Sequence, residues 1–218
     1  MDESEETWDL MIFGDRGVGK SSFRLKVSME HSNDGFEINP RIEGPVDRRV
    51  VIEGRPCVLW IDESLWTSHY ALTSERCLGD IAEMIRRYRY FILMYDITSV
   101  ESFDSIDFHH RFIKEVIQKY PDVNCSGPQP PHEPSTKKLR FLLIGMKSDL
   151  TDRRQVSRSQ AESLANTLEG CIGFVETSVK QDASQSMHDF IRALRSGSMQ
   201  RSDRSNTWLK KVFGRLGT

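Results

Sequence analysis

The stretch GDRGVGKS at residues 14–21 decides the fold of this chain. It matches the pattern G-x-x-x-x-G-K-[ST], and it lies between an apolar run at 8–14 and a helical pattern at 20–31. In that setting, successive backbone N–H groups and a helix N-terminus surround phosphate groups. We therefore expect a nucleotide site in which Lys20 reaches the outer phosphates and the Ser21 hydroxyl binds Mg²⁺. The residues expected to line it here are Gly14, Asp15, Arg16, Gly17, Val18, Gly19, Lys20, Ser21 and Ser22.

Short apolar runs alternate with helical patterns along the chain. Near-continuous apolarity over so few residues predicts strands buried on both faces, as in a parallel sheet. The alternation predicts one α/β domain with helices on both faces of the sheet. Strands are expected at 8–14, 47–54, 56–62, 90–97, 139–146 and 171–178, with a hairpin turn at Gly54-Arg55, and helices at 20–31, 73–88, 100–119, 157–168 and 182–195.

Composition and charge exclude several classes of protein. The 218 residues carry a net charge of −2, so no overall field directs the chain to nucleic acid, and no nucleic-acid partner is expected. Four cysteines lie far apart without a CxxC pair, which is typical of reduced thiols in a cytoplasmic protein. No signal peptide and no apolar run of about 18 residues is present, so a membrane span is not expected.

The sequence divides into a domain and two flanking segments. Residues 1–7 form an acidic extension, 8–196 the domain, and 197–218 a basic tail. A proline-rich stretch at 121–138 is expected to be a surface insertion. Residues 207–216 have a short amphipathic pattern, which favours either a membrane-surface or partner-binding helix or an end that packs on its own domain. No cysteine follows Cys171, so prenylation is not expected, and contact with the inner face of a membrane would be peripheral.

Five segments together resemble the Ras-superfamily small GTPases, in their Ras and Rab branches. GDRGVGKSS, VVIEG, YDITSVESF, LLIGMKSDL and FVETSVK occur in the order of that family and near its spacing, over residues 8 to 195. The resemblance implies a three-layer P-loop NTPase fold, the Ras-like G domain, with a six-stranded, mostly parallel sheet. It also implies GTP/GDP and Mg²⁺ as ligands, a monomer, and effector or regulator proteins that bind through the switch surface.

The resemblance implies that the stretch GMKSD, residues 145–149, recognises the base of the nucleotide. Met146 replaces the asparagine of the family, which would contact the base and brace the phosphate loop. Lys147 would lay its aliphatic stem over the base, and Asp149 would accept from two guanine N–H donors that adenine cannot offer. An aspartate left unpaired penalises adenine, so guanine preference should survive while affinity falls.

The resemblance assigns the rest of the base pocket to the stretch TSVK and to one aromatic residue. Ser178 and Val179 would bring a backbone N–H to the guanine oxygen, with Lys180 packing nearby. Phe36 is the candidate aromatic residue beside the base, although it could equally anchor its own loop.

The two switch segments depart from the family. The threonine that senses the terminal phosphate falls on Arg41, which either reaches a phosphate oxygen or is solvated. The magnesium-facing acid is Asp62 or Glu63, and we favour Asp62 because acids usually follow an apolar strand in this family. The glycine that follows is lost to Leu65 or Trp66, and the glutamine that orients water is lost to Trp66 or Thr67.

These losses bear on catalysis. Phosphoryl transfer depends on positioning and charge stabilisation, and loss of one such group typically slows it on the order of 10²–10³-fold. Arg16 and Arg41 are the candidate residues that could still supply charge. We expect very slow GTP hydrolysis in signal transduction or trafficking, with a non-hydrolysing, nucleotide-binding scaffold as the alternative. A scaffold without nucleotide is the third interpretation.

Overall fold

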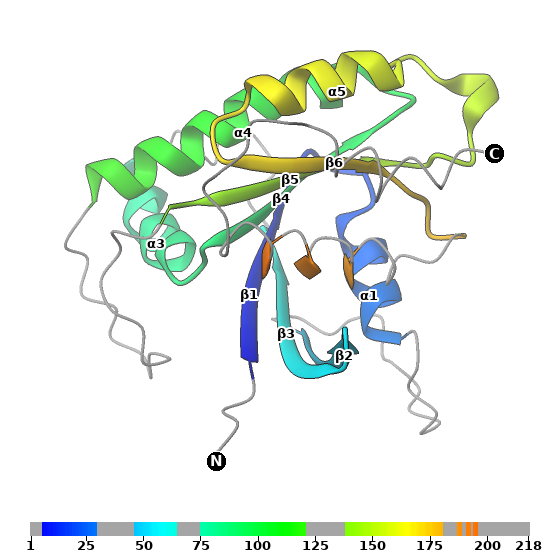
Figure 1. Ribbon diagram of the computed structural model, residues 1–218. Helices are drawn as coiled ribbons and strands as arrows, with labels where there is room; N and C mark the ends of the chain where they lie inside the picture. The colour runs from blue at the N-terminus through cyan, green and yellow to red at the C-terminus, as the bar shows by residue number, and fades with distance from the viewer. Residues whose placement is uncertain are drawn as a thin grey trace.

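A six-stranded sheet in the order β2-β3-β1-β4-β5-β6 forms the centre of the computed structural model (Figure 1). Strand β2 runs antiparallel to β3, and the other neighbouring pairs are parallel, so the expected mostly parallel sheet is confirmed. The structure describes residues 6–29, 46–64, 75–120, 138–180, 187–188, 191–192 and 194–195. The strands are β1 (Glu6–Phe13), β2 (Val46–Ile52), β3 (Arg55–Glu63), β4 (Tyr90–Asp96), β5 (Arg140–Met146) and β6 (Cys171–Glu176).

The helices begin where side chains can cap their free N–H groups. The Ser99 side chain accepts from Ser102 N at the start of α4. At the start of α5, Ser157 and Gln160 form a reciprocal capping box. The helices are α1 (Lys20–Met29), α3 (Glu75–Arg86), α4 (Val100–Lys119) and α5 (Arg158–Thr167), with a 3₁₀ turn at Thr151–Arg153. Residues 187–188, 191–192 and 194–195 are also helical, within the last predicted helix.

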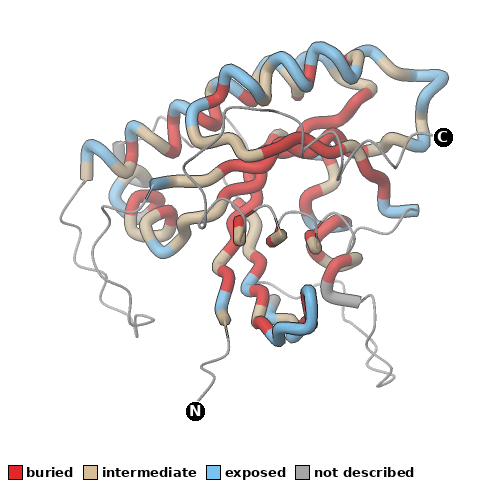
Figure 2. Tube along the Cα trace, viewed as in Figure 1, coloured by how far each residue is buried: buried red, intermediate tan, exposed pale blue. Residues whose placement is uncertain are grey.

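The sheet separates two hydrophobic cores, because successive side chains of a strand point to opposite faces. Leu10 and Ile12 of β1 pack on the α1 side, whereas Met11 and Phe13 pack against α3, α4 and α5. Figure 1 shows α1 on the opposite side of the sheet from α4 and α5, and Figure 2 shows the central strands as almost continuously buried. Burial on both faces explains the continuous apolar runs of the sequence.

The β2–β3 hairpin turns one residue earlier than the sequence predicted. Ile52 pairs with Arg55, so the two-residue loop is Glu53-Gly54 rather than Gly54-Arg55. Both loop residues have positive φ, 55° and 74°. A loop of this length favours such a turn, because its twist matches that of the strands, and glycine suits the second position.

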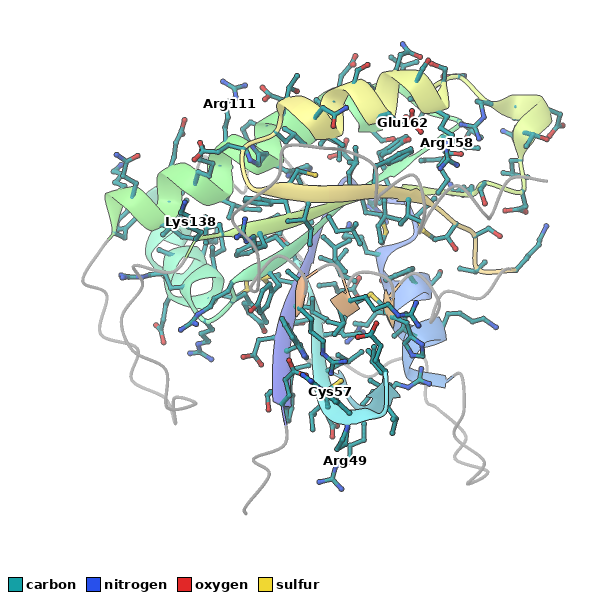
Figure 3. All side chains as sticks on the ribbon, viewed as in Figure 1. Arg49, Cys57, Arg111, Lys138, Arg158 and Glu162 are labelled. Carbon is teal, nitrogen blue, oxygen red and sulfur yellow. The ribbon has the colours of Figure 1, made fainter. Side chains whose placement is uncertain are left out.

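The first strand begins inside the predicted acidic extension. Glu6 opens β1, and its carboxylate accepts from Arg195 Nε at 3.0 Å, which ties the last helical residues to the sheet. On α5, Arg158 and Glu162 form a 3.1 Å ion pair one turn apart (Figure 3). Within the described ranges, no helix is both long and apolar enough to span a membrane.

Candidate nucleotide site

The carboxyl ends of five parallel strands bring the predicted site residues to one edge of the sheet. Gly14 follows β1, Glu63 ends β3 and Asp96 ends β4, while Lys147 and Ser178 follow β5 and β6. In open α/β sheets, ligands bind in the crevice outside these strand ends. Residues separated by more than 160 positions in the sequence are thereby gathered along one edge, as a phosphate end and a base end.

Two glycines of the phosphate loop permit contacts that a side chain would block. A Cβ at Gly14 would lie 2.2 Å from the Met94 carbonyl oxygen, so the loop can leave β1 only with glycine there. Gly19 has a φ of 109°, and a Cβ on it would lie 3.4 Å from the terminal methyl carbon of Met146. The loop therefore packs closely against β4 and against the residue that replaces the family's asparagine.

Lys20 curls over the loop that precedes it. Its ammonium donates to the Gly14 carbonyl at 2.8 Å and to the Asp15 carbonyl at 2.9 Å, and the residue is buried. Burial lowers the pKa of Lys20, and the negative charges of Glu63 and Asp15 oppose that shift. An ammonium has three N–H donors, so two hold the loop in shape and a third can serve a phosphate oxygen.

The other loop residues divide into an anchor and an open rim. Val18 is buried in the α1-side core and fixes the loop to the domain. Arg16 and Gly17 are exposed at the rim, and Ser21 and Ser22 are exposed at the start of α1. The guanidinium of Arg16 thus lies where it can reach a bound anion without the cost of burial.

The acid that faces Ser21 is Glu63, which corrects our preference for Asp62. Ser21 Oγ donates to Glu63 Oε2 at 2.8 Å, whereas Asp62 Oδ2 accepts from the Tyr88 hydroxyl at 3.0 Å beside α3. The reason is the alternation of the strand: Glu63 shares the α1-side face with Ile61, and Asp62 takes the other. Glu63 also forms a 3.2 Å ion pair with Arg24 of α1.

At the base end, Asp149 is held by neighbours from the loop after β6. Its Oδ2 lies 2.8 Å from Lys180 Nζ, and hydrogen bonds from Lys180 first and from Ser178 as well lower its pKa. Ser148 N donates to the Thr177 carbonyl at 3.1 Å, which joins the two loops. The carboxylate is therefore ionised and oriented, with its side chain 23% exposed and accessible to a ligand.

Lys147 and Met146 complete this end. Lys147 has a left-handed φ of 63°, and its ammonium donates to Asp96 Oδ2 at 2.5 Å. Burial raises the pKa of Asp96, but hydrogen bonds from Lys147 and Thr98 outweigh it, and the pKa lies below its ordinary value. Met146 is buried against the phosphate loop and fills the position with apolar contact. Val179 is exposed beside them.

The structure adds a clamp on the phosphate loop that the sequence did not predict. The carboxylate of Asp15 accepts from Ser105 of α4 and lies 3.0 Å from Nε2 of His109, a buried residue on the same helix. The neighbouring His110 contacts the Glu169 carbonyl, whereas His109 ties α4 to the loop. Its spacing from Ile106 and Ile113 on the buried helix face is the only signal the sequence offered.

Several predicted residues lie outside the described part of the chain. They are Phe36, Arg41, Leu65, Trp66, Thr67, most of the insertion at 121–138, and the tail at 197–218, including 207–216.

Comparison with known proteins identifies the family that the fold and the two-ended site indicate. The model of the Ras family matches residues 9–196. Ras-like protein 1 of Pyricularia oryzae is 30% identical over 201 residues, which cover 88% of this chain and 77% of that protein. Protein ras-2 of Neurospora crassa is 30% identical over 198 residues, which cover 88% of this chain and 81% of that protein. The chain belongs to the Ras family of small GTPases, and residues 14–21 are its GTP-binding loop.

Proposed function

We propose that this chain binds GTP and GDP with preference for guanine, hydrolyses GTP very slowly, and acts in intracellular signal transduction or trafficking. The observation that carries the proposal is the pairing of an intact phosphate loop with an oriented Asp149 on the same edge of the sheet. Charged recognition groups at both ends fit a ligand with phosphates at one end and a hydrogen-bonding base at the other.

Guanine preference rests on Asp149. An ionised carboxylate accepts hydrogen bonds and cannot donate them, so it pairs with the two N–H donors of guanine. The Lys180 contact at 2.8 Å holds the carboxylate in place before a ligand arrives. With adenine the same carboxylate would lose those partners, which is how a polar site rejects a wrong ligand.

The proposal of slow hydrolysis depends on how the second switch segment, which follows β3, aligns with the family sequence. Counted from Glu63, the acid that faces Ser21, the glycine position of the family falls on Trp66 and the glutamine position on Thr67. Threonine is too short to orient water as glutamine does, and a tryptophan side chain would stand where the family keeps an unhindered backbone N–H. We expect hydrolysis about 10²–10³-fold slower than in a Ras-family protein that has both residues.

The experiment is nucleotide identification followed by single-turnover hydrolysis. The purified full chain is extracted and its nucleotide identified by chromatography, and bound GTP is then followed over hours with the Lys20→Ala protein as the blank. Bound guanine nucleotide with turnover just above the blank supports the proposal. Adenine nucleotide, or no nucleotide at any concentration tested, would refute it.

A non-hydrolysing scaffold is the second candidate, and the same register at Trp66 and Thr67 favours it. Such a protein would be stabilised by nucleotide yet would bind its effector or regulator equally in both states. The melting temperature would rise with GDP, whereas partner affinity would be the same with GDP and with a GTP analogue. Absence of turnover together with equal affinities would replace the first proposal with this one.

A further inference from the structure

The wall of the phosphate end contains a buried ion pair between α1 and the end of β3. Arg24 Nη2 lies 3.2 Å from Glu63 Oε1, and the two side chains are only 6% and 9% exposed. Arg24 lies one helical turn after Lys20, and Glu63 is the acid that faces Ser21. A cationic side chain is thus built into the place where the family implies Mg²⁺.

The residues present fit Mg²⁺ in ligand type but not in charge. Ser21 Oγ and Glu63 Oε2 lie 2.8 Å apart, and hydroxyl and carboxylate oxygens are ligands that Mg²⁺ accepts. Arg24 Nη2, however, lies 3.2 Å from Oε1, the other oxygen of the same carboxylate, so a cation bound to Glu63 would lie close to the guanidinium. A divalent cation and a guanidinium at that separation repel each other, so one must leave for the other to bind well.

No second described carboxylate compensates for the guanidinium. Asp62 points to the other face of the sheet, toward Tyr88, and Asp15 is held by His109 and Ser105. Among the residues that the structure describes, no group of three or more histidines, cysteines, aspartates or glutamates is arranged to hold a metal. The Ser21 side of the site therefore has one carboxylate, and Arg24 already neutralises it.

We propose that Arg24 is the resident cation of this site, and that the chain therefore retains guanine nucleotide without requiring Mg²⁺. The inference rests on the proposed nucleotide binding. Arg24 neutralises Glu63, so the carboxylate does not repel the phosphates in the absence of metal. Lys20, the N-terminus of α1 and the Arg24 guanidinium then supply the positive charge of the phosphate end. Arginine suits this part because its guanidinium stays charged when buried.

The test compares the release of methylanthraniloyl-GDP in Mg²⁺ and in EDTA. In the wild type, release in EDTA should be within about threefold of release in Mg²⁺. In Arg24→Gln, which leaves Glu63 available to metal, EDTA should accelerate release on the order of tenfold or more. Wild-type release that accelerates tenfold in EDTA, or an Arg24→Gln response equal to that of the wild type, overturns the inference.

Two further variants separate this effect from a general loss of stability. Arg195→Gln breaks another arginine–glutamate pair, Arg195–Glu6 at the start of β1, whose arginine side chain is 10% exposed and whose glutamate side chain is 38% exposed, and it should leave the EDTA response unchanged. Arg24→Gln/Glu63→Gln removes both charges, which proteins tolerate better than one unpaired buried charge, and should return the response toward that of the wild type. If Arg24→Gln fails to fold, the wild-type response alone decides, and it does so in either direction.

A measurement of metal binding without nucleotide distinguishes failure of this inference from failure of the proposed function. Mn²⁺ binding to nucleotide-free protein is measured by electron paramagnetic resonance at matched concentrations. The Arg24→Gln protein should bind Mn²⁺ more tightly than the wild type, and the double variant should lose that gain. If no guanine nucleotide binds, the proposed function fails, and the Mn²⁺ comparison still decides: wild-type binding equal to that of Arg24→Gln overturns the inference.

Discussion

Replacing Asp149 with asparagine tests how the base is read. Asp149 is ionised at neutral pH, and Lys180 holds one of its oxygens at 2.8 Å, so the carboxylate is a fixed double acceptor. Asparagine has nearly the same shape but presents one acceptor and one N–H₂ donor. Against guanine, that donor would face another donor, while the neighbouring hydrogen bond would lose its charge.

The size of the effect follows from those two changes. A hydrogen bond to a charged group contributes about ten- to a hundredfold in affinity, and an unpaired buried donor adds a penalty of its own. We expect the affinity of Asp149→Asn for GDP to fall on the order of 10²–10³-fold. Xanthine carries a carbonyl where guanine carries its amino group, so the asparagine N–H₂ gains a partner, and affinity for xanthosine diphosphate should exceed that for GDP.

The assay is equilibrium titration with fluorescent GDP and its xanthosine counterpart. Asp152→Asn makes the same chemical change at an exposed position in the 3₁₀ turn nearby, and it should bind GDP as the wild type does. If Asp149→Asn retained wild-type affinity for GDP, Asp149 would not contact the base, and the argument for guanine preference would be wrong.

Three further changes test other parts of the site. Gly14→Ala would place a Cβ 2.2 Å from the Met94 carbonyl oxygen and should cost about 3 kcal/mol or more of unfolding free energy, measured in urea. Met146→Asn should lower the melting temperature without nucleotide, because it buries an amide, yet tighten GDP binding about tenfold in a fluorescence titration. Burial raises the pKa of Asp15, but the hydrogen bonds and charges of its neighbours, chiefly His109, hold it below the ordinary 3.8. Ionised Asp15 therefore stabilises the fold above about pH 4, and the stability gap to Asp15→Asn should close as the pH falls through the lower folded pKa.

Each of the three has a clear contrary result. A Gly14→Ala protein as stable as the wild type would mean that the loop can leave β1 by another path. GDP binding unchanged in Met146→Asn would mean that this position does not support nucleotide. A stability gap for Asp15→Asn that stayed constant from pH 7 to pH 3 would mean that the carboxylate charge contributes nothing to the clamp.

The sheet could be predicted from the sequence because strands buried on both faces leave a local signature. The runs at 90–97 and 139–146 are apolar whichever face each residue takes, so finding the strands required no knowledge of their neighbours. The turn at Glu53-Gly54 was misplaced by one residue, because glycine can occupy either position of a two-residue loop, and only the pairing of Ile52 with Arg55 settles it.

The contacts within the site could be predicted less well, because they depend on which face a side chain takes. Asp62 and Glu63 are equivalent in a list of residues, but the pleat sends one to Tyr88 and the other to Ser21. Asp15 and His109 are 94 positions apart, and no local pattern joins them. The alternation of side chains along β3 was one signal in the sequence that the prediction did not use. Leu59 and Ile61 are buried on the α1 side of the sheet, and Glu63, two residues further along the strand, must share that face.

The family residues that this chain keeps and those that it replaces act at different stages, nucleotide binding and the chemical step. Under the proposed function, Asp149, Lys147 and the backbone of the phosphate loop would contact parts of the nucleotide that change little between the bound state and the transition state. Contacts of that kind tighten binding without accelerating the chemical step. The replaced positions, at Trp66 and Thr67, belong to groups that act on the terminal phosphate and the attacking water. Under the proposed function, the chain therefore keeps the residues that bind the bound state and the transition state equally, and it has replaced the residues that stabilise only the transition state. The Arg24–Glu63 pair is consistent with this, because Arg24 then takes the place of the metal.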